Sequence, residues 1–271
     1  MSFVCFNGNF LPADELLFTS QNRSFRYGDG VFETIKICKG KILFEQFHFD
    51  RLFLSLKMLQ IKFSFARELL SENISALCKR NDCLQLARIR LAVYRNCQNE
   101  AEYVIEATAL AREVNQWNEK GLTLGLFPYS RKNSDAFSNL KSANFLPYVL
   151  AELYAKENGL DDALVLNAFN NIADSSKANI FLILKNAVYT PALSQGCISG
   201  VVRRFLIDGL KQNDYRIFQQ EISEADLLEA DEVFLTNSIY DLRWVQSFKG
   251  KNYSHERTFN IYQQFFSTIY S

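Results

Sequence analysis

The sequence predicts an α+β protein built from two domains. Its 271 residues exceed one small domain, since about 150 residues per domain is usual. In the first 110 residues, segments with strand periodicity surround two segments with helical periodicity, which is typical of an antiparallel sheet covered by helices. A polar stretch at 111–120 interrupts this pattern. We therefore predict a small N-terminal α+β domain at 1–114, a linker at about 111–120, and a larger C-terminal mixed α/β domain at 115–271.

Turn residues and apolar periodicity define the elements of the N-terminal domain. Asn7-Gly8 between two aromatic segments predicts a tight hairpin. In the segment 86–95, apolar and polar residues alternate strictly, which predicts a strand with one buried face. The predicted elements are a hairpin at 2–12, strands at 31–37 and from 41, helices at 49–59 and 66–80, and strands at 86–95 and 103–110.

The C-terminal domain alternates between strands and helices. A helix that follows a polar loop should stop near Asn158-Gly159, because glycine commonly ends helices. The predicted elements are a strand at 121–127, a polar loop at 129–139, a helix at 143–157, strands at 162–167 and 179–184, a helix at 200–212, a strand at 232–235, a hairpin and a final amphipathic helix.

Charge and cysteine content exclude several classes of function. Lys plus Arg and Asp plus Glu both total 30, so no net field attracts nucleic acid or anionic lipid. No apolar run is long enough to cross a membrane and no signal peptide begins the chain. With only two histidines and no Cys-x-x-Cys pair among six cysteines, we expect no metal site. We therefore expect reduced thiols in a cytoplasmic protein, and a small-molecule substrate as its partner in place of nucleic acid or membrane.

Common nucleotide and hydrolase motifs are absent, so chemistry must come from lysine, carboxylates or tyrosine. Lys141 stands at a predicted loop-to-helix junction before an apolar run, where a lowered pKa would make it a nucleophile. Ser199-Gly200 precedes a helix whose free N–H groups could bind phosphate. Arg51, Asp174 and Thr236-Asn237-Ser238 are further polar candidates. Taken singly, each has an ordinary explanation as a surface charge, a cap or a turn.

The order of these segments along the chain resembles the class IV aminotransferase family, the fold-type IV pyridoxal phosphate enzymes. The resemblance covers about residues 25–245 and rests on collinear short motifs. The matching segments are Tyr27-Gly28-Asp29-Gly30-Val31-Phe32-Glu33-Thr34, His48-x-x-Arg51-Leu52, Lys141-Ser142-Ala143-Asn144, Asp161-Asp162-Ala163-Leu164 with Asp174-x4-Asn179-Ile180-Phe181, Thr190-Pro191 with Gly196 to Arg203, and Thr236-Asn237-Ser238. The implied fold is the two-domain, D-amino-acid aminotransferase-like one, with its site at the domain cleft in a homodimer.

The resemblance also implies roles at the matching positions. Lys141 would carry pyridoxal 5'-phosphate as a Schiff base and shuttle the proton. Arg51, the backbone amides of Val201 and Val202, and the Ser238 hydroxyl would bind the phosphate. Asp174 would face the pyridine nitrogen, where the family usually has the longer glutamate.

Two reactions fit the resemblance, and a third possibility stays open. The chain leans to 4-amino-4-deoxychorismate lyase, because Thr34 and Asn237 match polar positions of the lyases, although their arginine-containing loop is missing after Arg95. An amino-acid aminotransferase of D-amino-acid or branched-chain type is the alternative. Phe145, where branched-chain enzymes carry tyrosine, weakens the branched-chain form. The third possibility is a non-catalytic ligand-binding scaffold.

Five residues are predicted to lie in the substrate pocket, all of them by matching the family's segments. For the aromatic members, packing within the sheet is a nearly equal alternative. The five are Tyr27, Phe32, Thr34, Tyr94 and Asn237.

Overall fold

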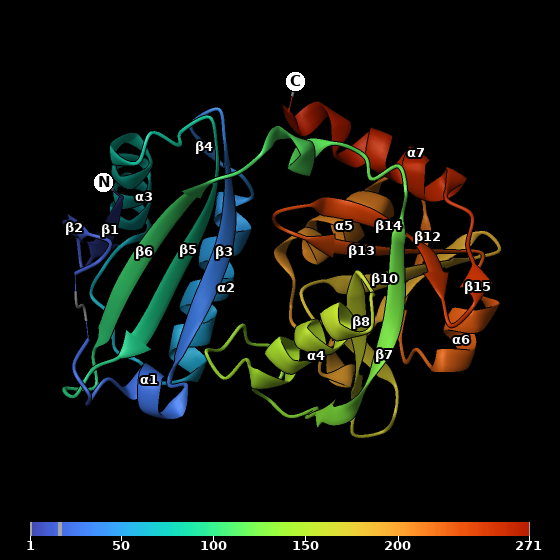
Figure 1. Ribbon diagram of the computed structural model, residues 1–271, viewed down its shortest axis with the longest axis horizontal. Coiled ribbons are helices and arrows are strands. Elements are labelled where there is room, and N and C mark those ends of the chain that lie inside the picture. Colours follow the sequence, from blue (N-terminus) through green and yellow to red (C-terminus); the bar gives the residue numbers. More distant parts are fainter. Residues whose placement is uncertain (1, 16–17, 271) are drawn as a thin grey trace. The chain divides into compact units, whose positions relative to one another are not determined.

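The computed structural model describes residues 2–15 and 18–270, and these form two compact units (Figure 1). Unit 1 holds the chain up to Val114 together with Leu140–Phe145, and unit 2 holds Asn115–Asn139 and the chain from Leu146 onward. The chain passes from unit 1 to unit 2 after Val114, and the short segment Leu140–Phe145 packs within unit 1.

Unit 1 is an antiparallel sheet in the order β2-β1-β6-β5-β3-β4, with helices packed on it. Helix α2 packs on β3, and α3 packs on β6 and β1. The inward faces of these elements form one hydrophobic core. The elements are β1 (Phe3–Phe6), β2 (Asn9–Pro12), α1 (Arg23–Tyr27), β3 (Gly30–Cys38), β4 (Lys41–Ile42), α2 (Glu45–Met58), α3 (Arg67–Arg80), β5 (Leu86–Arg95) and β6 (Ala101–Ala109).

Unit 2 is a mixed sheet in the order β12-β11-β10-β13-β14-β7-β8-β9, with β15 paired to β14. Parallel pairs join β7 to β8 and to β14. The elements are β7 (Leu122–Lys132), α4 (Leu146–Glu157), β8 (Asp162–Asn167), β9 (Ile172–Ser175), β10 (Asn179–Leu184), β11 (Ala187–Pro191), α5 (Val201–Gln212), β12 (Arg216–Gln220), α6 (Glu224–Glu229), β13 (Glu232–Asn237), β14 (Asp241–Phe248), β15 (Lys251–Asn252) and α7 (Glu256–Phe265), with 3-10 turns at Arg112–Asn115, Leu193–Gln195 and Ser267–Tyr270.

Of the predicted element bounds that differ from the structure, four bear on the candidate site. Strand β7 runs on to Lys132, because its polar end pairs with β8 at Leu166 and Asn167. Asp174, predicted to lie in a turn, stands in β9 opposite Val165. Helix α2 begins at Glu45, so Arg51 lies in its second turn rather than at its start.

The fourth error concerns the helix after Lys141. The backbone of residues 141–143 bonds to β3 instead of turning into a helix. Helix α4 therefore starts only at Leu146, with Pro147 in its first turn, where a missing N–H costs nothing.

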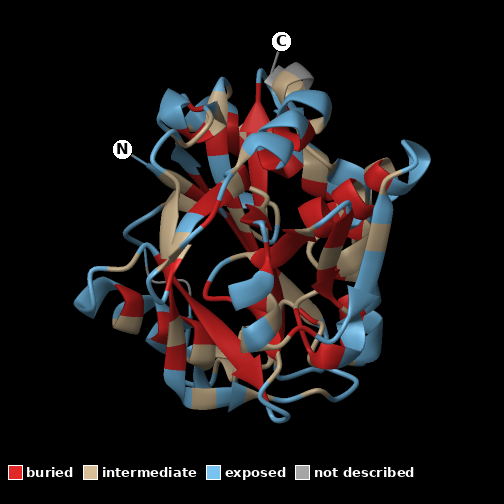
Figure 2. Ribbon diagram, turned by 90° about the vertical axis from the view of Figure 1, so that its right-hand side faces the viewer, coloured by how far each residue is buried: buried red, intermediate tan, exposed pale blue. Residues whose placement is uncertain are grey.

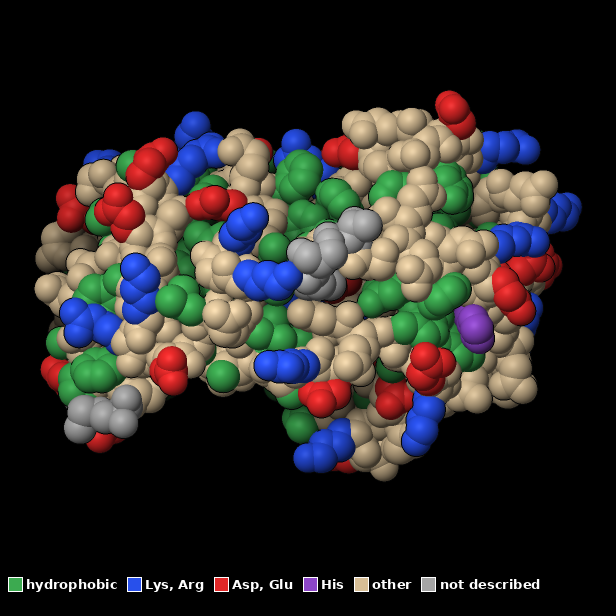
Figure 3. Space-filling view, turned by 90° about the horizontal axis from the view of Figure 1, so that it is seen from above, with side chains coloured by type: hydrophobic (Ala, Val, Ile, Leu, Met, Phe, Trp, Pro, Cys, Tyr) green, Lys and Arg blue, Asp and Glu red, His purple; other side chains and the backbone are tan. Residues whose placement is uncertain are grey.

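Burial follows the sheets, and charge is spread over the surface. Buried residues lie mainly along the strands, whereas the helices alternate between buried and exposed residues (Figure 2). On the face shown in Figure 3, acidic and basic side chains are interspersed. Within the described part of the chain, no helix combines the length and the apolar character that a bilayer crossing requires.

Candidate active site

Lys141 lies on an extended segment that continues the sheet of unit 1. The Phe32 amide donates to the Lys141 carbonyl at 2.9 Å, and the Ala143 amide donates to the Gly30 carbonyl at 2.9 Å. These bonds hold the side chain against two aromatic rings. The Lys141 Nζ atom is 4.4 Å from the Phe32 ring centroid and 5.1 Å from that of Phe145. The amine thus has the apolar, aromatic surroundings that suit a reactive lysine.

The glycines of the Tyr27-to-Thr34 segment make room for this arrangement. Gly28 has a φ of +66°, and a Cβ there would lie 3.1 Å from the Asn144 amide nitrogen. A Cβ on Gly30 would lie 2.7 Å from the Val93 carbonyl oxygen. Both positions therefore need glycine, the first for its left-handed backbone and the second for the close approach of β5.

Glu33, His48 and Arg51 form a buried polar cluster between β3 and α2. Arg51 donates to Glu33 from Nε at 2.8 Å and from Nη2 at 2.5 Å, and His48 Nδ1 lies 2.7 Å from the same carboxylate. Burial raises the pKa of Glu33, but Arg51 and His48 outweigh it and bring the pKa to about 2. Burial lowers the pKa of His48, so a neutral imidazole donates to Glu33. The cluster fixes the plane of the Arg51 guanidinium.

Arg90 was not among the predicted site residues, yet it shares its aromatic neighbour with Lys141. Its guanidinium carbon lies 4.0 Å from the Phe32 ring centroid. Arg90 pairs with Thr34 across β5 and β3, so Phe32, Thr34 and Arg90 occupy one face of the sheet. Burial lowers the pKa of Arg90, which nevertheless keeps its charge at neutral pH. The sequence did contain one indication of this position. The strict alternation of β5 placed Arg90 on the face of the sheet that points away from the hydrophobic core.

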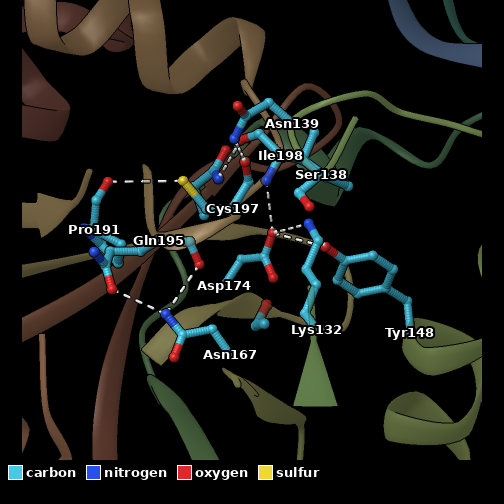
Figure 4. Close-up of polar contacts among 12 residues, drawn as sticks. Lys132, Ser138, Asn139, Tyr148, Asn167, Asp174, Pro191, Gln195, Cys197 and Ile198 are labelled. Carbon is cyan, nitrogen blue, oxygen red and sulfur yellow. Dashed lines mark hydrogen bonds and ion pairs between the residues drawn. The ribbon is translucent and has the colours of Figure 1, made fainter. Parts of the chain in front are cut away.

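Asp174 is the centre of a buried polar cluster in unit 2 (Figure 4). Its Oδ2 atom accepts hydrogen bonds from the Tyr148 hydroxyl and the Ile198 amide, each at 2.9 Å, and lies 3.6 Å from Lys132 Nζ. Its Oδ1 atom is buried and has no hydrogen-bond partner within the described residues. Burial raises the pKa of Asp174, while Lys132, the Ile198 amide and Tyr148 lower it. The carboxylate is thus oriented, with one acceptor atom unused.

The N-terminus of α5 provides a group of backbone donors in the same unit. Gly200 is its N-cap residue, and no side chain caps the amides of the first turn, which begins with Val201 and Val202. A Cβ on Gly200 would lie 1.9 Å from Asn179 Oδ1. Strand β13 carries Thr236, whose hydroxyl is buried and has no hydrogen-bond partner among the described residues. Ser238, the predicted phosphate ligand, follows at the end of β13 and is partly exposed.

Three of the predicted substrate residues share one face of the sheet. Phe32, Thr34 and Tyr94 lie on the face of β3 and β5 that Lys141 contacts at Phe32, and Tyr94 packs edge-on against Phe18. Tyr27 is 64% exposed at the end of α1. The Asn237 side chain accepts hydrogen bonds from the amides of the turn after β13, which is a structural role.

The family model described as Amino-transferase class IV matches residues 30–248. The chain is 30% identical to the aminodeoxychorismate lyase of Vibrio harveyi over 80% of this chain and 82% of that protein. It is 25% identical to the D-alanine aminotransferase of Listeria monocytogenes over 91% of this chain and 88% of that protein.

Solved structures share the fold. The branched-chain amino acid aminotransferase of Escherichia coli superposes with a TM-score of 0.87 at 20% identity, over 98% of this chain and 93% of that one. The predicted fold class is therefore confirmed.

Proposed function

The chain belongs to the class IV aminotransferase family and is a pyridoxal-phosphate-dependent enzyme, and we propose that it is a 4-amino-4-deoxychorismate lyase that works through Lys141. The observation that carries the proposal is the amine of Lys141 held against Phe32, with the Arg90 guanidinium on the same ring. The lyase relative at 30% identity supports the same reaction.

The side chains fit this cofactor in three respects. Lys141 offers a primary amine for its aldehyde. Asp174 offers a buried carboxylate oxygen without a partner, which suits a protonated ring nitrogen. The uncapped start of α5, with Val201 and Val202, offers amide donors to a phosphate. We assign Arg51 and Ser238 to the phosphate on the family's pattern alone.

The bound cofactor supplies an electron sink for the bonds that break at the substrate carbon. Around it, the residues of the chain bind, orient and move protons. Lys141 would take a proton from the substrate and return it. Its amine is the base that the family's pattern puts beside the reacting carbon. Asp174 holds the proton on the ring nitrogen. Phe32 and Phe145 place aromatic rings beside the amine of Lys141.

Arg90 is our candidate for the substrate carboxylate. The expected arginine loop after Arg95 is absent, but Arg90 brings a guanidinium to the ring that Lys141 contacts. Arg90→Met should raise KM for a carboxylate substrate by about 10- to 100-fold, since such charge-assisted contacts contribute about 1.5–3 kcal/mol. Arg88→Met is the matched control, because Arg88 is exposed two residues along the same face of β5. Equal KM values in both variants would remove Arg90 from the site.

An amino-acid aminotransferase is the second candidate, because the D-alanine aminotransferase relative covers 91% of this chain. Phe145 lacks the hydroxyl of the branched-chain enzymes, which disfavours that substrate class. Parallel assays with aminodeoxychorismate and with D- and L-amino acids plus a keto acid would separate the two. Formation of 4-aminobenzoate supports the lyase, and exchange of amino groups alone overturns it.

The test of the cofactor assignment is chemical. Borohydride treatment of the protein with added pyridoxal phosphate should remove the visible absorption band and leave the cofactor attached to Lys141 by a stable C–N bond. Lys141→Ala should lose both the label and turnover. Labelling at another lysine, or turnover in the variant, would refute the assignment. Cofactor binding without any turnover on either substrate class would instead identify a non-catalytic scaffold.

The proposal includes a homodimer in the cytoplasm. Helix α4 exposes an apolar stripe at helical spacing, made of Leu146, Val149, Leu150 and Leu153, and such stripes are usually covered by a partner. All six cysteines are free thiols, as in a reducing compartment. Light scattering of wild type and Leu150→Glu tests the dimer: a monomeric wild type would contradict it.

A further inference from the structure

Lys132 and Tyr148 come from separate elements of unit 2 to meet the Asp174 carboxylate. Lys132 ends β7, Tyr148 lies in the first turn of α4, and Asp174 lies in β9. The Lys132 ammonium donates a hydrogen bond to the Tyr148 hydroxyl, and its Nζ atom is 4.9 Å from the tyrosine ring centroid. The side chains of Lys132 and Asp174 are 12% and 3% exposed. Solvent therefore screens this ion pair weakly.

All the donors converge on one oxygen of the carboxylate. The Tyr148 hydroxyl, the Ile198 amide and the Lys132 ammonium all approach Asp174 Oδ2, at 2.9, 2.9 and 3.6 Å. Rotation of the carboxylate would break these contacts together. Oδ1 is consequently the atom left for a further donor, and its burial makes an unmet hydrogen bond costly.

The same contacts decide whether Asp174 carries charge. Burial raises its pKa, and Lys132 opposes burial most strongly. The other titratable groups that face Asp174 are Tyr148 on α4 and Cys197 before α5. Burial raises the pKa of Tyr148 well above its usual value and that of Cys197 to about 11, so both stay neutral at neutral pH. Lys132 is thus the group that supplies the opposing charge.

We propose that Lys132 and Tyr148 are positioning residues, which keep the Asp174 carboxylate ionised and turned so that Oδ1 can accept a hydrogen bond from the protonated ring nitrogen of the cofactor. This arrangement would allow an aspartate to do the work of the family's usual glutamate. The proposal rests on the proposed function, since it presupposes that pyridoxal phosphate binds. An ammonium beside Asp174 favours the form in which the carboxylate is charged and the proton stays on the ring nitrogen.

The test measures the cofactor rather than turnover. Wild type, Lys132→Met, Lys132→Arg and Tyr148→Phe are loaded with pyridoxal phosphate labelled with ¹⁵N in the ring. The ring-nitrogen chemical shift reports its protonation, and equilibrium dialysis gives the cofactor Kd. Lys249→Met is the matched control, because Lys249 forms an ion pair with Glu224 on the surface of the same unit.

We expect Lys132→Met to raise the cofactor Kd by about 10- to 100-fold and to move the nitrogen signal toward the unprotonated value. Tyr148→Phe should raise the Kd by about 2- to 10-fold, because it removes one of the three contacts that orient the carboxylate. Lys132→Arg should restore the protonated signal, and Lys249→Met should match wild type.

Two outcomes overturn the proposal in different ways. If wild type binds the cofactor and both Lys132→Met and Tyr148→Phe give the same Kd and nitrogen signal as wild type, Lys132 and Tyr148 have only a structural role, and the proposed function survives. If wild type fails to bind pyridoxal phosphate, the proposed function and this inference both fail. Should Lys132→Met not fold, Tyr148→Phe decides alone, since it removes a single oxygen atom. An unchanged nitrogen signal and Kd in Tyr148→Phe then refute the positioning role.

Discussion

Replacing Glu33 with glutamine should remove the charge that organises the buried cluster of unit 1. Glu33 is 1% exposed and accepts two hydrogen bonds from Arg51 and one from His48. Glutamine keeps the shape and one acceptor, but it leaves the Arg51 guanidinium without its anion. The variant therefore isolates the electrostatic part of the cluster from its packing.

The magnitude follows from the pKa of Glu33. A fall from 4.5 to about 2 on folding corresponds to about 3 kcal/mol of stability at neutral pH. Because the folded pKa is below the unfolded one, this stability is fully present above pH 4.5 and is lost as the pH falls toward 2. The lowered pKa of His48 adds a loss that begins below its ordinary value of 6.5, because the imidazole of the unfolded chain then takes up a proton while the buried imidazole stays neutral.

Urea unfolding of wild type and Glu33→Gln tests this reasoning. Both tryptophans, Trp117 and Trp244, lie in unit 2, so unit 1 is better followed by amide hydrogen exchange of β3 than by fluorescence. The difference in free energy of unfolding should be about 3 kcal/mol at neutral pH and should shrink on acidification below pH 4.5.

The control is Glu106→Gln, because Glu106 is 54% exposed and lies 3.8 Å from Arg90. This surface pair should contribute less than about 1 kcal/mol. Equal stability of Glu33→Gln and wild type, or a difference that persists unchanged in acid, would refute the electrostatic account of the cluster.

Three further predictions concern single positions. Asp174→Asn should keep the cofactor bound yet lower kcat at least about 10-fold, because a neutral amide holds a ring proton less well; an unchanged kcat would make Asp174 structural. Gly200→Ala should raise the cofactor Kd, because its Cβ would lie 1.9 Å from Asn179 Oδ1 and must displace the start of α5; dialysis measures this, and a wild-type Kd would remove α5 from the phosphate site. Gly30→Ala should destabilise unit 1 by about 1–3 kcal/mol in hydrogen exchange, since its Cβ would meet the Val93 carbonyl at 2.7 Å, and unchanged exchange of β3 would contradict that reasoning.

The sequence predicted best those elements that bury one face against a neighbour. Strand β5 and helix α3 have the predicted bounds within one residue, because their apolar periodicity matches the face that the core covers. Strands with polar residues were missed. The end of β7 and the whole of β9 are strands only because β8 pairs with both of them, and a local pattern cannot show which strand lies alongside.

The candidate site was predictable as a set of residues and not as an arrangement. The motif around Lys141 identified the lysine, but its aromatic neighbours depend on the bonds between Lys141 and Phe32, which are far apart in the sequence. Arg90 became a candidate only once the register of β3 and β5 placed it opposite Thr34. Lys132 lay in a segment predicted to be a loop, so nothing local connected it with Asp174.

The buried polar atoms bear on the choice between an enzyme and a scaffold that has lost its chemistry. An aspartate in place of the family's glutamate, taken alone, suggests loss of function. Among the residues that the structure describes, however, Asp174 and Thr236 each keep one buried oxygen without a hydrogen-bond partner. Each such atom costs about 1–3 kcal/mol unless a ligand satisfies it. A scaffold that bound no cofactor would gain stability by losing these groups, so their presence in β9 and β13 favours a site that binds the cofactor.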